Sequence, residues 1–96
     1  MTIGNLELDR KSYSISRNGQ RLQLTPREFQ LLDLLARNQN IVLTREVILD
    51  RIWGLEADVS LKTIDATVKL LRKKLDSMGG KDTIRSIRGV GYTIES

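Results

Sequence analysis

The segment from Ser60 to Met78 constrains the fold of this chain more than any other. Apolar residues recur along it at steps of three and four, at Leu61, Ile64, Val68, Leu71 and Leu75. This spacing is typical of one face of an α-helix. Gly79 and Gly80 then end the periodicity. The pattern predicts a helix over about residues 60–78 that buries one face against a core and exposes the other.

The exposed face of this helix is predicted to be basic. Opposite the apolar stripe lie Lys62, Lys69 and Lys73, with the small Ala66 among them. From Leu61 to Tyr92 the chain has eight basic and three acidic side chains, a net charge of +5, whereas the remainder has a net charge of −1. Such an asymmetry is typical of a surface that binds a polyanion. The alternative is a solvated, lysine-rich face with no partner.

Leu70 is also predicted to point outward, beside Lys69 and Lys73. A solvated helix normally carries a polar residue at such a position. Two interpretations stay open. Leu70 contacts a thymine methyl group in the major groove of DNA, or it makes a partial contact with the closing hairpin or the second helix.

The residues before this helix predict strands followed by two helices. Three apolar runs between residues 3 and 24 predict three short antiparallel strands, with Asn18-Gly19 as a type I′ turn between the last two. Thr25-Pro26-Arg27-Glu28 predicts an N-cap and capping box for a helix that ends at residues 38–40. An extended stretch over residues 41–43 and a helix from the Thr44 cap to about Trp53 follow.

A connection from Leu55 to Val59 joins this second helix to the third. After the third helix, residues 83–88 and 92–95 predict two strands joined by Gly89-Val90-Gly91. Arg85 and Arg88 make this hairpin basic. An arginine on a narrow hairpin is able to enter a minor groove of DNA.

Composition excludes several functions. The 96 residues contain neither cysteine nor histidine, which excludes disulfides, the common zinc sites, and catalysis by a histidine base or cysteine nucleophile. The carboxylates of Glu56 and Asp58 lie in a polar connection without a phosphate-binding loop or a partner base. We therefore expect no enzyme, no catalytic residue, no metal and no cofactor.

Length and hydropathy bound the rest. A chain of 96 residues predicts a single domain over residues 1–96. No apolar run approaches the roughly 18 residues of a membrane span, and Met1-Thr2-Ile3-Gly4 does not begin a signal peptide. We expect a cytoplasmic protein without membrane contact.

The string Arg85-Ser86-Ile87-Arg88-Gly89-Val90-Gly91-Tyr92 resembles the wing of OmpR/PhoB-type winged-helix domains, the DNA-binding effector halves of two-component response regulators. Residues 24–32, 44–54 and 63–75 resemble further blocks of that family, in the same order and at the same spacing. The resemblance covers nearly the whole chain. It implies an α+β fold, a winged helix-turn-helix with an N-terminal antiparallel sheet, three helices and a C-terminal β-hairpin wing.

The resemblance also implies a function and a set of contacts. It implies sequence-specific binding of double-stranded DNA, with the helix of residues 60–78 in the major groove and the wing of residues 83–95 in the adjacent minor groove. By matched position, the base-facing candidates are Asp65, Thr67, Lys69, Leu70, Arg72, Ser86 and Arg88. Lys62 and Lys73 are candidates for phosphate contacts.

Two of these positions stand out. The family often carries arginine or another polar residue where this chain has Leu70, which bears on the DNA sequence recognised. The helical periodicity puts Thr67 closer to the buried side than the family pattern does.

The resemblance implies partners as well. The connection from Leu55 to Val59 corresponds to a loop that some members offer to RNA polymerase. A phosphoaccepting receiver domain is absent from this chain, so we expect either an effector half or a winged helix at the N-terminus of a membrane sensor. A free monomer that dimerises on DNA is expected. The rival interpretation is a winged helix that binds a protein instead of DNA, because a fold does not by itself define a function.

Overall fold

The computed structural model describes residues 2–54, 58–80 and 82–95. The chain begins with a four-stranded antiparallel sheet in chain order: β1 (Thr2–Ile3), β2 (Leu6–Asp9), β3 (Ser14–Arg17) and β4 (Gln20–Gln23). The sequence predicted three strands here, and that number was wrong. Ile3 pairs with Leu6 across a tight turn at Gly4 and Asn5, so one apolar run folds back into two strands.

The predicted turn at Asn18 and Gly19 is confirmed. Both residues have positive φ, 50° and 82°, as a type I′ turn requires. The turn places Arg17 opposite Gln20 and Ile15 opposite Leu22. Ile15 is thereby directed into the core, where it is fully buried.

The three predicted helices form, the first two of them with side-chain caps. Helix α1 (Pro26–Arg37) begins with the predicted capping box, in which the Glu28 N–H donates to Thr25 Oγ1 at 3.2 Å and the Thr25 N–H donates to Glu28 Oε1 at 2.9 Å. Helix α2 (Arg45–Ile52) begins with a bond of 3.1 Å from the Val47 N–H to Thr44 Oγ1. Helix α3 (Leu61–Ser77) lies between Ser60 and Met78, as its periodicity predicted.

The wing is part of a second sheet of three strands, in the order β5 (Leu43–Thr44), β7 (Gly91–Thr93) and β6 (Arg85–Ile87). The extended stretch begins two residues later and ends one residue later than predicted, and the hairpin strands are shorter. Gly91 lies where β7 pairs with β5, and a Cβ atom at this position would overlap the Leu43 carbonyl oxygen. Glycine is required here because the two backbones approach so closely.

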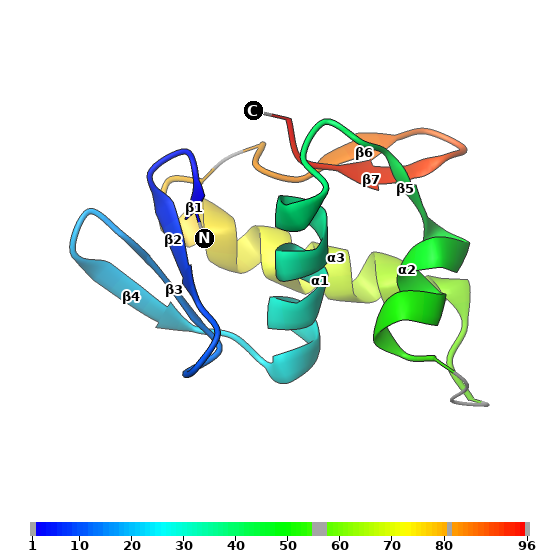
Figure 1. Ribbon diagram of the computed structural model, residues 1–96, viewed down its shortest axis with the longest axis horizontal. Coiled ribbons are helices and arrows are strands. Elements are labelled where there is room, and N and C mark those ends of the chain that lie inside the picture. The colour runs from blue at the N-terminus through cyan, green and yellow to red at the C-terminus, as the bar shows by residue number, and fades with distance from the viewer. Residues whose placement is uncertain (1, 55–57, 81, 96) are drawn as a thin grey trace.

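The core lies between the three helices and the inner face of the first sheet. Its fully buried members come from every layer and include Ile15, Leu31, Leu35, Ile48, Ile64, Leu71 and Ile94. Figure 1 shows the first sheet at one end of the molecule and the wing at the other, with α1 between them and α3 running along the long axis. The three principal extents are 39, 25 and 20 Å. Helix α3 thus carries its outer face along the molecule up to the wing.

Candidate nucleic-acid interface

Helix α3 divides into a buried stripe and an exposed face. Ile64, Val68, Leu71 and Leu75 are at most 1% exposed, as their spacing predicted. On the other side, five exposed residues define what we term the cationic face: Lys62, Ala66, Lys69, Leu70 and Lys73. The helix therefore presents three ammonium groups along one side, with the small Ala66 one turn before Leu70.

The charges of the cationic face are not neutralised within the protein. Lys62, Lys69 and Lys73 form no ion pair with any carboxylate in the described part of the chain. Lys69 and Lys73 are also four residues apart, a spacing at which like charges repel each other on a helix by roughly 0.2–0.5 kcal/mol. An external polyanion would turn this unfavourable arrangement into a favourable one.

Lys74, next to Lys73 in the chain, is used differently. Its Nζ donates to Glu28 Oε1 at 2.7 Å, which joins α3 to the start of α1. Burial raises the pKa of the Glu28 carboxyl, but hydrogen bonds from Lys74 and the Thr25 N–H outweigh this and leave its pKa below the usual value. Lys74 therefore stabilises the fold and does not belong to the cationic face.

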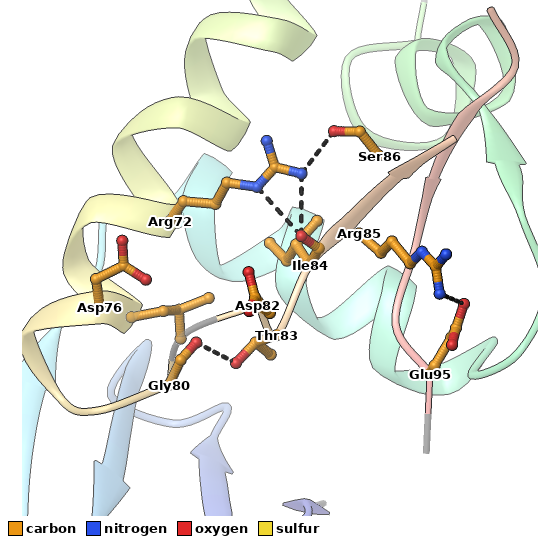
Figure 2. A pocket seen from close by; sticks show the side chains of 10 residues that line it. Arg72, Asp76, Gly80, Asp82, Thr83, Ile84, Arg85, Ser86 and Glu95 are labelled. Atoms are coloured by element: carbon orange, nitrogen blue, oxygen red, sulfur yellow. Dashed lines mark hydrogen bonds and ion pairs between the residues drawn. The ribbon is translucent and has the colours of Figure 1, made fainter. Parts of the chain in front are cut away.

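Arg72 connects α3 to the wing. Its Nε and Nη2 donate to the Ile84 carbonyl oxygen at 3.2 and 3.0 Å, and Nη2 also donates to Ser86 Oγ at 2.6 Å (Figure 2). The guanidinium lies over the ring of Tyr92, 5.6 Å from its centroid. Because these acceptors are neutral, Arg72 keeps its positive charge at the meeting point of helix and wing.

Asp65 connects α3 to α2 and to β7. It accepts a hydrogen bond from Arg45 Nη1 at 2.9 Å on one oxygen and from the Tyr92 hydroxyl at 2.7 Å on the other. Burial, and then the bond to Asp65, raise the pKa of Tyr92 to about 12. We term Arg45, Asp65, Arg72, Ser86 and Tyr92 the helix–wing junction.

The remaining predicted residues lie at the margins of this surface. Thr67 is half-buried and its hydroxyl donates to the Thr63 carbonyl at 2.8 Å. Arg88 directly follows β6 and is exposed at the turn of the wing. The turn is closed by a bond of 2.9 Å from the Val90 N–H to the Ile87 carbonyl. Arg88 therefore extends the cationic face beyond the helix, onto a narrow hairpin.

A pocket of about 660 Å³ lies between the end of α3 and β6, and Figure 2 shows its lining. Asp76, Asp82 and Glu95 contribute carboxylates to it, and Arg72 and Arg85 contribute guanidinium groups. Arg85 pairs with Glu95 at 2.9 Å. Since carboxylates outnumber guanidinium groups, this pocket does not suit a polyanion, which favours the cationic face as the binding surface.

The predicted site residues lie on α3 and the wing, and they fall into two groups. Lys62, Lys69, Leu70, Lys73 and Arg88 are exposed, whereas Asp65, Thr67, Arg72 and Ser86 bond within the protein. Arg45 and Tyr92 were not among the candidate site residues predicted from the sequence. Asp65 lies 20 residues from Arg45 and 27 from Tyr92, so no local periodicity relates them. The available signal was a tyrosine, amphipathic by nature, in the strand predicted over residues 92–95.

The described residues contain no group of three or more acidic, histidine or cysteine side chains placed to hold a metal ion. Glu56, one of the two carboxylates considered above, lies outside them. In the same part of the chain, no helix combines the length and the apolar character that crossing a membrane requires.

The comparison with protein families agrees with this geometry. Residues 19–94 match the family described as "Transcriptional regulatory protein, C terminal". The chain therefore belongs to this family of OmpR/PhoB-type effector domains. The match includes all three helices and the wing, and the fold predicted from the resemblance, a winged helix-turn-helix, is confirmed.

Individual relatives support the assignment. The chain is 41% identical over 92 residues to response regulator ArlR of Staphylococcus haemolyticus, covering 96% of this chain and 42% of that protein. It is 39% identical over 96 residues to the phosphate regulon transcriptional regulatory protein PhoB of Rhizobium meliloti, covering 100% of this chain and 42% of that protein. The chain thus spans about two fifths of the length of these curated relatives.

Among solved structures, the chain resembles the DNA-binding domain of response regulator AdeR, which was determined in complex with an intercistronic region. The TM-score is 0.83 at 28% identity, over 96% of this chain and 94% of that one. The family match and the structural likeness thus indicate the same fold.

Proposed function

We propose that this chain binds double-stranded DNA sequence-specifically, as the effector domain of a transcriptional response regulator. In this proposal α3 enters the major groove and the wing enters the adjacent minor groove. The observation that carries it is the set of four exposed cations on α3 and at the turn of the wing, Lys62, Lys69, Lys73 and Arg88, without a carboxylate partner among the described residues. A major groove about 12 Å wide admits one helix, and its phosphates supply the missing negative charge.

The nine candidate residues divide by their surroundings. In our proposal Lys62 and Lys73 contact phosphates, whereas Lys69 and Leu70 face base edges in the major groove and Arg88 enters the minor groove. Asp65, Thr67, Arg72 and Ser86 lie at the inner margin of the interface. The bonds of Asp65, Arg72 and Ser86 hold α3 and the wing at a defined angle, while Arg72 adds its charge. Base contacts then depend on an angle that the helix–wing junction maintains.

Other parts of the proposal follow from family membership and the length of the relatives. We propose one domain over residues 1–96, joined in the whole protein to a receiver domain, acting in the cytoplasm without enzymatic activity of its own. The domain is a monomer when free and a dimer on DNA. The connection of residues 55–59, part of which lies outside the described residues, contacts RNA polymerase.

The dependence of binding on salt tests this function. Operator duplexes are first selected from a random pool, and binding is then measured by fluorescence anisotropy between 50 and 200 mM salt, roughly the range over which phosphate contacts dominate the change. Two to four phosphate contacts predict a slope of log K against log salt between about −1.8 and −3.6. A selection that yields no preferred duplex, or binding that does not change with salt, would contradict the proposal and favour a protein partner.

A further inference from the structure

The position of Leu70 is now defined. Leu70 is 56% exposed and is not among the partly buried apolar residues that pack against the core, so more than half of its surface is open to a partner. Leu70 also lies well inside α3, seven residues before its last residue, and not at a frayed end. It is the most exposed of the large apolar side chains in the described residues.

Leu70 and Ala66 form a short apolar strip beside the lysines of the cationic face. Ala66 lies one turn before it, and both are exposed. Lys69 precedes Leu70, and Lys73 lies one turn after it. The methyl groups thus lie beside lysine side chains that attract phosphates, while the small Ala66 allows close approach of the helix backbone.

The chemistry of leucine restricts what this strip is able to recognise. Leucine has neither a hydrogen-bond donor nor an acceptor, so against guanine or cytosine it would leave the base's polar groups without partners. Thymine alone among the bases presents a methyl group, at C5, on the floor of the major groove. Apolar contact with that methyl is therefore the favourable way to place Leu70 in the groove.

Building on the proposed function, we infer that Leu70 is a specificity-determining residue that recognises a thymine methyl group in the major groove. Burying a group of this size stabilises a complex by roughly 0.8 kcal/mol, which corresponds to about four-fold in affinity. The contact would make the preferred operator contain a thymine at a fixed position for each bound domain.

Replacement of thymine by deoxyuridine tests this, because the change removes only the 5-methyl group. Each thymine of a selected operator is replaced in turn, and the affinity of the wild-type chain and of Leu70→Ala is measured at one salt concentration. Ile41→Ala is the matched control. Ile41 is 53% exposed, lies outside α3, and loses the same number of atoms on replacement because isoleucine and leucine are isomers.

We expect deoxyuridine at one thymine per bound domain to weaken wild-type and Ile41→Ala binding by about four-fold. Leu70→Ala binds the thymine and deoxyuridine duplexes equally, and circular dichroism shows it folded because the position is exposed. Wild-type binding that ignores the methyl group at every position overturns the inference, as does a Leu70→Ala variant that keeps full methyl dependence. In either case salt-dependent binding to the operator persists, so failure of the inference is distinct from failure of the proposed function.

Discussion

Three arginines near the N-terminal sheet and three lysines of α3 are used in opposite ways. The arginines are paired: Arg10 and Arg37 both contact Asp33, at 3.1 and 3.2 Å, and Arg21 lies 3.5 Å from Asp9. On the cationic face, Lys62, Lys69 and Lys73 contact no carboxylate of the described residues. Both groups are exposed, so exposure alone does not separate them. The two groups differ in whether a carboxylate lies within ion-pair distance.

This difference teaches which charges serve a ligand. A paired surface cation contributes at most about 1 kcal/mol to stability. The partner carboxylate also cancels most of its attraction for a distant polyanion. An unpaired cation next to another is unfavourable for the free domain, but keeps its full charge available for binding. Exposed basic side chains therefore stabilise the fold in the first group and are available for binding in the second.

The largest expected effect is on DNA affinity. Lys69→Ala should weaken binding to the selected operator by about 1–3 kcal/mol if the side chain contacts a base, and Arg88→Ala should weaken it as well. Lys11→Ala, an exposed lysine between β2 and β3, is the matched control and should bind normally. Gel-shift titrations measure all three. Normal binding by both Lys69→Ala and Arg88→Ala would remove these residues from the interface.

The next largest effect separates two neighbouring lysines through their partners. Glu28→Gln removes the charge that Lys74 contacts, and should lower the free energy of unfolding near pH 7 by about 1.5 kcal/mol, the low end for a charged hydrogen bond, because Lys74 is one third exposed. DNA affinity should not change. Lys73→Ala should do the reverse, with weaker DNA binding and a stability that is raised slightly, by roughly 0.2–0.5 kcal/mol, because its repulsion with Lys69 is removed.

The dependence on pH follows from the lowered pKa of Glu28. A carboxyl group with a lowered pKa in the folded state stabilises the protein above the pKa of the unfolded state, and this stabilisation is lost as the pH falls through the folded pKa. Urea unfolding at pH 7 and pH 3 should therefore show the wild type and Glu28→Gln converging in acid. A constant difference between them would mean that the Glu28 charge contributes nothing.

A smaller effect concerns the helix–wing junction. Tyr92→Phe removes the hydrogen bond to Asp65 and should cost about 1 kcal/mol of stability. Because the pKa of Tyr92 is raised to about 12, the wild-type advantage is complete below pH 10 and is lost as the pH rises through 12. The free energies of unfolding of the wild type and of Tyr92→Phe are compared at pH 8 and above pH 10. An advantage that does not decline in alkali would show that this bond is not the cause.

The smallest effect is expected where the charges are paired and exposed. Arg37→Ala breaks the contact with Asp33 four residues earlier on α1, and should change stability by less than about 0.5 kcal/mol. DNA affinity should stay the same. Thermal unfolding together with the same gel shift checks both expectations. A loss of DNA affinity comparable to that of Lys69→Ala would contradict the distinction between paired arginines and unpaired lysines.

Local patterns predicted most of the fold. The stripe from Leu61 to Leu75, the capping box at Thr25 and Glu28, and the Asn18-Gly19 turn depend on residues within four positions of each other, and all three are confirmed. The number of N-terminal strands was wrong because the apolar run from Ile3 to Leu8 does not distinguish one strand from two around a tight turn. The pairing of β5 with β7 joins residues nearly fifty positions apart, and no local pattern indicates it.

For the candidate site, the sequence by itself determined which side chains share the outer face of α3, because helical periodicity places Lys62, Lys69 and Lys73 on one side. It determined the excess of positive charge there as well. Only the tertiary structure decided which cations keep their charge available. Lys73 and Lys74 are adjacent, yet only Lys74 meets a carboxylate, since the packing of α1 against α3 brings Glu28 to it across 46 residues. Long-range packing determines which basic side chains meet a carboxylate. A basic side chain with such a partner stabilises the fold, whereas one without it is available to bind a ligand.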